Sequence, residues 1–196
     1  GLNGRVAGSH LTSMHSMDNY YVSKLLPLMH ESNISVIANP LINITLQGRH
    51  DSYPKRRGMT RVPEQMDAGL NVAFGHDCVM DPWYPLGSHD MLDVAHMALH
   101  IAQMTGQKEM ESCFDAITSN PAQILGLQGY GINKGCKGDL IILQCSNAIE
   151  ALRLRPARLF VIKNGRIISS TDPVSYNLNL SGKNIQTDLI FRNNQT

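Results

Sequence analysis

The order of apolar and polar stretches predicts alternating strands and helices along the first 117 residues. Short apolar runs of strand length lie at residues 5–9, 34–38 and 71–74. Stretches with apolar residues at helical spacing predict helices at residues 17–31, 61–68, 92–104 and 111–117. Strands that alternate with helices in this way are typical of parallel strands with crossover helices. The pattern therefore predicts an α/β sheet or barrel.

In the first predicted helix, Tyr20, Leu25, Leu28 and Met29 can share an inner face. Proline inside a helix removes a backbone hydrogen bond, so Pro27 predicts a kink or a break.

Each predicted strand is followed by a polar segment, and the second of these is long. The stretch "LINITLQGRHDSYPKRRGMT", residues 41–60, is too rich in glycine, proline and charge to predict a core element. Loops of this length in a compact domain are usually functional or mobile. The carboxyl ends of parallel strands are where α/β folds bind ligands, so these polar segments are placed for chemistry.

The pattern changes after about residue 120. The stretches "GDLIILQC", "ARLFVIKNGRIISS" and "YNLNL" resemble short strands, and "KNGR", residues 163–166, is a hairpin signal. We therefore expect the α/β part at residues 1–120, and a helix followed by a small β-rich part at residues 121–196.

Composition narrows the classes of partner. The 196 residues are 42% hydrophobic and 17% charged, with a formal net charge of +1, which is ordinary for a globular protein that buries a core. A charge so close to zero gives no electrostatic reason to expect nucleic acid or a membrane surface, so a small molecule is the expected ligand. The four cysteines form no CxxC pair, which favours a reduced, cytoplasmic compartment. The start, "GLNGRVAGSH", lacks an initiator methionine, so we expect it to be a cut within a longer chain.

His10 and Asp77 are the main candidates for chemistry. Each follows a predicted strand, so in one parallel sheet an imidazole and a carboxylate would face the same crevice. That pairing suits metal-assisted or acid–base catalysis. Spacing alone favours a helix-capping histidine and a turn aspartate, because a complete metal site needs three or four ligands.

Other residues have competing interpretations. His76 would point to the opposite face from Asp77 and is expected to pack, and His15 is expected in a loop. His96 and His100 have the i, i+4 spacing of helical zinc motifs but lack the glutamate of H-E-x-x-H, which favours packing or solvent.

Three further features could line a site or belong to the surface. Trp83 could form a flat wall for a planar ligand or anchor its proline-rich loop. Cys78 has no identifiable base partner, so it lines a pocket at most. The basic group at 55–57 is expected in a solvated loop or a subunit contact.

Three segments together carry a more specific signal. The strings "VAGSHLTSMHS", "ANPLINITLQGRHDSYPKRRGMTRV" and "NVAFGHDCVMDPWYPLG", in this order and spacing, resemble the C-terminal part of the bacterial cytosine deaminase family within the amidohydrolase superfamily. The resemblance continues through "NPAQILGLQGYGINKGCKGDLIIL" to about Ser170. It implies the last three βα units of a (β/α)8 barrel with one divalent metal, Fe(II) or Zn(II), and part of a small β-sandwich.

The resemblance also implies roles for individual residues. Asp77 would ligate the metal and shuttle a proton, and His10 would hydrogen-bond the attacking hydroxide. Trp83 would line the base pocket with Cys78 nearby. The family often has a second aspartate where this chain has Cys78, which affects the choice between cytosine and related amino-heterocycles. The implied reaction is hydrolytic deamination of cytosine to uracil and ammonia, in pyrimidine salvage.

The remaining metal ligands of the family have no counterpart here, and a barrel usually needs about 250 residues. This chain alone is therefore expected to be inactive and poorly stable, with an open sheet edge. The resemblance favours a homo-oligomer. Alternatives are an amino-triazine or isopropylamino-triazine amidohydrolase, because pocket residues set that choice, and a non-catalytic binding protein that kept half of a barrel.

Overall fold

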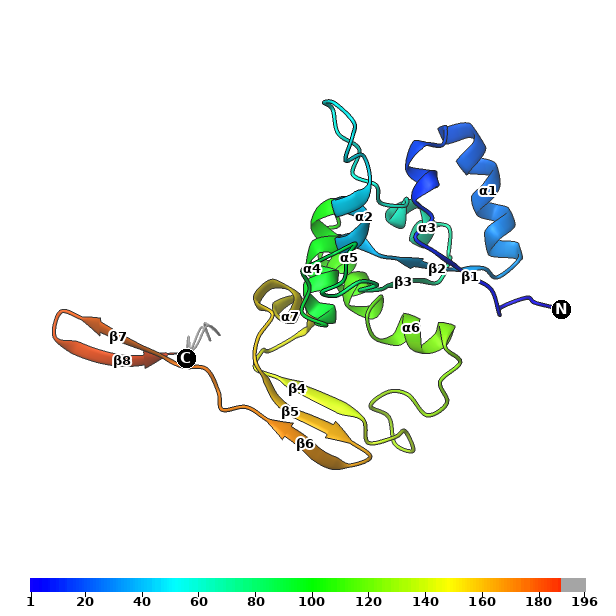
Figure 1. The fold of residues 1–196 in the computed structure, drawn as a ribbon. Coiled ribbons are helices and arrows are strands. Elements are labelled where there is room, and N and C mark those ends of the chain that lie inside the picture. Colours follow the sequence, from blue (N-terminus) through cyan, green and yellow to red (C-terminus); the bar gives the residue numbers. More distant parts are fainter. Residues whose placement is uncertain (188–196) are drawn as a thin grey trace. The chain divides into compact units, whose positions relative to one another are not determined.

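A computed structural model describes residues 1–187, and Figure 1 shows the arrangement of the elements. The chain divides into two compact units, the first covering residues 1–128 and the second beginning at Gly129. The mixed α/β content predicted from the sequence is confirmed. Residues 188–196 of the predicted C-terminal part lie outside the described residues.

The first unit is built on a parallel sheet with the order β1-β2-β3. Its strands are β1 (Ala7–Ser9), β2 (Ser35–Ala38) and β3 (Val72–Phe74), all in the predicted places. Every residue of β3 is buried, and β2 alternates between buried and half-buried positions. The register aligns Ser9 with Ile37 and Ala38 with Phe74, so the carboxyl ends of the strands lie together.

Helices surround this sheet and connect its strands (Figure 1). They are α1 (Asn19–Glu31), α2 (Pro40–Leu46), α3 (Val62–Asp67), α4 (Met91–Ile101), α5 (Gln107–Asp115) and α6 (Ser119–Ile124). Helix α4 contributes Val94, Ala95 and Ala98 to the core, each fully buried. The predicted helices at 61–68, 92–104 and 111–117 are confirmed with shifted ends.

Helix α1 buries a face that overlaps the predicted one only in part, since Met29 is buried and Leu25 half-buried as expected. Val22, Leu26 and Met29 are buried, whereas Tyr20 and Leu28 are 75% and 59% exposed. The helix begins at Asn19, where the Asp18 carboxylate caps it by accepting from the backbone N–H of Tyr21. The buried i, i+4, i+7 stripe starts at Val22, so Tyr20 and Leu28 face away. Pro27 does not interrupt the helix.

Helix α2 corrects the expectation that residues 41–60 contain no core element. Pro40 occupies its first turn, where a missing N–H costs no hydrogen bond, and Leu41, Ile42 and Asn43 are buried. The rest of the segment, residues 47–60, is an irregular loop that projects from the ends of α2 and α3 (Figure 1).

The basic group of this loop is held by contacts with one carboxylate and two backbone carbonyls. Arg56 pairs with Asp51 at 3.2 Å, Arg57 donates to the carbonyl of Ile101, and Lys55 donates to that of Arg49.

The second unit contains an antiparallel sheet with the order β4-β5-β6, and a separate hairpin. Its elements are β4 (Leu140–Leu143), α7 (Ala148–Leu154), β5 (Arg158–Lys163), β6 (Arg166–Ser170), β7 (Tyr176–Leu180) and β8 (Lys183–Thr187). The predicted hairpin at "KNGR" is confirmed. Asn164 and Gly165 have φ angles of 50° and 73°, the left-handed pair that a tight two-residue turn requires.

Within residues 1–187, none of the helices combines the length and the hydropathy that crossing a bilayer requires.

Candidate functional site

His10 and Asp77 meet at the carboxyl ends of β1 and β3. His10 directly follows β1, and its backbone N–H donates to the carbonyl of Ile37 at 2.8 Å. Asp77 lies beyond β3 on the other side of β2. The imidazole Nε2 of His10 is 3.3 Å from the carboxylate Oδ2 of Asp77, and both side chains are more than one-third exposed. The structure therefore brings together the two residues that the sequence placed at separate strand ends.

Both residues adopt an unusual backbone conformation. The φ angles of His10 and Asp77 are 66° and 65°, in the left-handed region that residues other than glycine seldom occupy. In this conformation the chain turns sharply at the strand end, and the side chain is aimed across the sheet edge. Strained backbone of this kind clusters at functional sites, where the surrounding structure holds it in place.

The side-chain amide of Asn39 connects the ends of the strands. The Asn39 side chain, buried at the end of β2, donates from Nδ2 to the hydroxyl of Ser9 at 3.1 Å. On its other side the Asn39 Oδ1 lies against Gly75, where an added Cβ would come within 2.3 Å of it. The glycine is thus required by close packing. It lets the chain approach Asn39 just before Asp77.

Asn43 of α2 contacts His10 directly. Its amide Nδ2 is 2.8 Å from the imidazole Nδ1 of His10, on the side of the ring opposite Asp77. Sequence reasoning missed both asparagines, because the segment that contains Asn43 was interpreted as a loop. The Asn-Pro pair at 39–40 was the available signal, since proline is favoured in the first turn of a helix.

The loop after Asp77 is shaped by Asp81. The Asp81 carboxylate accepts from the backbone N–H groups of Trp83 and Tyr84 at 2.9 and 2.8 Å. The Cys78 thiol also donates to this carboxylate. The shared hydrogen bond raises the pKa of Cys78 to about 11 and, with the backbone donors, lowers the pKa of Asp81. Cys78 is therefore protonated at neutral pH, which excludes it as a ready nucleophile.

Tyr84, and not Trp83, anchors this loop. Tyr84 is buried and lies edge-on to His76, with 6.4 Å between ring centroids, whereas the Trp83 side chain is 66% exposed. Burial, followed by the charge of Asp93, raises the pKa of Tyr84. The exposed indole is free to contact a ligand, because the packing role belongs to its neighbour.

His76 packs under the same loop. Its ring Nδ1 donates to the carbonyl of Cys78 at 3.0 Å, and its ring centroid lies 6.2 Å from that of His89. It is buried and does not join the His10–Asp77 pair. His96 and His100 lie on α4, where a ring nitrogen of His100 donates to the carbonyl of His96.

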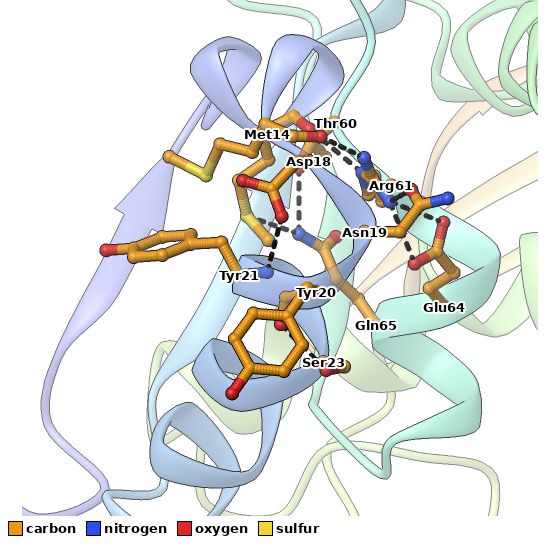
Figure 2. A network of polar contacts seen from close by, with 11 residues as sticks. Met14, Asp18, Asn19, Tyr20, Tyr21, Ser23, Thr60, Arg61, Glu64 and Gln65 are labelled. Atoms are coloured by element: carbon orange, nitrogen blue, oxygen red, sulfur yellow. Dashed lines mark hydrogen bonds and ion pairs between the residues drawn. The ribbon is translucent and has the colours of Figure 1, made fainter.

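The segment after His10 is fixed by Arg61 (Figure 2). Residues Thr12–Ser16, which include His15, form a 3₁₀ helix, and Arg61 donates to the carbonyls of Met14 and Met17 at its end. The same guanidinium donates to the Asn19 side chain at 2.8 Å. Arg61 thereby ties the loop after β1 to the start of α1 and to α3.

The donor set at the strand ends has the right chemistry for a divalent metal but is incomplete. An aspartate oxygen beside an imidazole suits zinc or iron. Catalytic zinc sites use three protein ligands, and residues 1–187 contain no group of three or more histidine, cysteine, aspartate or glutamate side chains placed to hold a metal. The described residues fit part of such a site.

Comparison with known proteins shows the family of the chain. A model of the amidohydrolase family matches residues 1–169. A solved structure of 5-methylcytosine deaminase from Klebsiella pneumoniae, liganded with 5-fluorocytosine, is 41% identical, with a TM-score of 0.88 over 91% of this chain and 43% of that one.

Two curated relatives are more distant. Pterin deaminase from Rhizobium rhizogenes is 29% identical over 88% of this chain, and N-isopropylammelide isopropyl amidohydrolase from Pseudomonas sp. is 28% identical over 86%. The chain spans only 40% and 39% of their respective lengths. Because the family model covers most of its length, the chain belongs to the amidohydrolase family.

Proposed function

We propose that the protein containing this chain is a metal-dependent aminohydrolase that deaminates cytosine or a closely related aminopyrimidine. Amidohydrolases generally use a divalent metal and act on C–N bonds. The observation that carries the proposal is the pairing of His10 with Asp77 at 3.3 Å, at the end of a sheet that matches a 5-methylcytosine deaminase.

In this proposal Asp77 is one ligand of the metal, and the other ligands come from outside residues 1–187. When bound, such a metal would supply a water with a lowered pKa, the nucleophile that hydrolysis needs at neutral pH. The second oxygen of Asp77 is suited to accept a proton and return it to a ring nitrogen or to the departing amine. His10 would orient the attacking water through a hydrogen bond at Nε2.

The loop after Asp77 would complete the pocket. The exposed indole of Trp83 is suited to lie flat against an aromatic heterocycle, held there by the backbone turn that Asp81 closes. Cys78, protonated beside Asp77, would present a small and weakly polar surface to the substrate. These residues, more than the metal site, would set the preference among heterocycles.

The curated relatives suggest two other substrate classes, pterins and N-isopropylammelide. The curated relatives are a pterin deaminase and an N-isopropylammelide amidohydrolase, both of similar identity to this chain. The higher identity to 5-methylcytosine deaminase, 41% against 29% and 28%, favours the pyrimidine.

A substrate panel tests the proposal. The full-length protein, loaded separately with zinc and with iron, is assayed for amine release from cytosine, 5-methylcytosine, pterin and N-isopropylammelide. We expect the highest kcat/KM for one of the two pyrimidines. A preference for pterin or N-isopropylammelide would reassign the substrate. No turnover of any of the four with either metal would favour a binding protein and contradict the proposal.

A further inference from the structure

The contact between Asn43 and His10 joins helix α2 to the end of strand β1. Asn43 lies within α2, where its N–H donates to the carbonyl of Asn39 and its carbonyl accepts from Gln47. The residue is only 3% exposed. Its side chain therefore has little freedom, and the amide nitrogen is held 2.8 Å from Nδ1 of the imidazole.

The two contacts of the His10 ring select one tautomer. The amide nitrogen of Asn43 can only donate, so Nδ1 must be the unprotonated, accepting nitrogen. The proton of the neutral ring then lies on Nε2, which faces the Asp77 carboxylate at 3.3 Å. With the amide turned over, Nδ1 would carry the proton, and the lone pair of Nε2 would face a negative oxygen. The geometry on both sides of the ring disfavours that arrangement.

The other end of the Asn43 amide makes no stabilising hydrogen bond within residues 1–187. Its Oδ1 is buried and has no hydrogen-bond partner among residues 1–187. Leaving a buried carbonyl oxygen unpaired opposes folding, and an apolar side chain of similar size would avoid that cost. What the amide contributes is the donor aimed at His10.

We propose that Asn43 is a positioning residue that fixes the tautomer of His10 and keeps the ring proton on Nε2. The ring nitrogen beside Asp77 is then a hydrogen-bond donor to whatever occupies the strand ends. The effect on turnover rests on the proposed function, whereas the effect on the tautomer does not.

The tautomer can be read by NMR. In full-length protein labelled with ¹⁵N-histidine, in its metal-free and zinc-loaded forms, the chemical shifts of the ring nitrogens distinguish a protonated from an unprotonated Nδ1. We expect wild-type His10 to carry its proton on Nε2. Asn43→Leu, which removes the donor, should give a mixture of tautomers. Asn43→Asp, which offers only an acceptor, should place a proton on Nδ1.

Gln65→Met is the matched control. Gln65 is also a fully buried amide with an unpaired oxygen, but its nitrogen donates to Thr60 and not to His10. The tautomer of His10 should be unchanged in this variant. If the role is also catalytic, both Asn43 variants should lower kcat roughly 10- to 100-fold while KM stays within about twofold, the scale expected for residues that orient a site ligand.

The outcomes separate this inference from the proposed function. A wild-type His10 protonated on Nδ1, or the wild-type tautomer retained in both Asn43 variants, would overturn it. If Asn43→Leu does not fold, Asn43→Asp, which keeps the size of the side chain, decides alone. If the wild-type protein deaminates none of the heterocycles, the proposed function fails while the NMR result still decides the role of Asn43.

Discussion

At the scale of single residues, the close packing behind the site requires a glycine at position 75, because a Cβ there would collide with Asn39. Gly75 lies between β3 and Asp77, and its backbone N–H donates to the carbonyl of Ala38 at 2.9 Å. The Asn39 amide occupies the space that a side chain would need. Asn39 therefore packs between Ser9 and Gly75, beside the strand ends that precede His10 and Asp77.

Gly75→Ala should therefore destabilise the protein by about 1–3 kcal/mol, because Asn39 or the strand must move to admit the Cβ. Thermal or denaturant unfolding measures this. Gly106→Ala is the control, since its added Cβ meets only the end of the flexible Glu109 side chain, at 3.0 Å. Equal losses in the two variants would show that the Asn39 contact is unimportant.

The residues around the strand ends also show which parts of the candidate site can be predicted from sequence. His10 and Asp77 were predictable as neighbours, because each follows a strand of one parallel sheet. Asn43 and Arg61 were not. Their roles depend on helix α2 and on a contact across 47 residues between Arg61 and Met14, and local patterns carry no information about either.

At the scale of elements, Arg61 joins three of them. Its side chain is only 15% exposed, and its acceptors lie at the end of the 3₁₀ helix, at the start of α1 and on α3. Figure 2 shows the guanidinium at the centre of this network. Hydrogen bonds from a charged donor contribute about 1.5–3 kcal/mol each, and an acceptor left unpaired in the interior carries a further cost.

Arg61→Gln should lower the free energy of unfolding by roughly 2–3 kcal/mol and speed amide hydrogen exchange in residues 12–17. The control is Arg153→Gln, because Arg153 is 56% exposed and its ion pair with Glu150, in the second unit, should contribute less than about 1 kcal/mol. Unchanged hydrogen exchange in residues 12–17 of Arg61→Gln would show that Arg61 does not hold the loop after His10 in place.

In the second unit, Asp139 fastens the β5–β6 turn to the start of β4. Its carboxylate accepts from the backbone N–H of Asn164 at 2.7 Å and from Lys163 at 2.5 Å. These bonds, the one from Asn164 first, lower the pKa of Asp139 in the folded state. A lowered folded-state pKa gives stability that is present above the unfolded value, about 3.9, and is lost as pH falls through the folded value.

The Asn164 amide should consequently be protected from hydrogen exchange at pH 5–7 and lose protection as pH falls below about 4. Asp139→Asn should lose much of the protection at pH 5–7 and remove most of this pH dependence. Exposed Asp172 provides the control substitution, Asp172→Asn, which should leave Asn164 unaffected. If the Asn164 amide stayed protected in Asp139→Asn, the β5–β6 turn would be stable without the Asp139 carboxylate.

At the scale of the whole molecule, the βα order of the first unit was accessible from hydrophobic periodicity, and the β5–β6 hairpin of the second from its turn residues. Helix α2 and the buried face of α1 were not, because a proline start and a shifted stripe changed which positions face the core. The strand-end chemistry follows from the parallel topology, which places residues 10 and 77 at one edge although 66 residues separate them in sequence. Under the proposed function, this edge is where the metal and the heterocycle would bind.

The most direct test of the central claim combines metal content with turnover. Full-length wild type, Asp77→Ala and His10→Ala are purified, bound zinc and iron are quantified, and cytosine deamination is followed. We predict that Asp77→Ala loses the metal and all activity, because a ligand is removed. His10→Ala should keep the metal but turn over at least about 100-fold more slowly, the range of acid–base and orienting contributions. Full activity in either variant, or full metal occupancy in Asp77→Ala, would contradict the account.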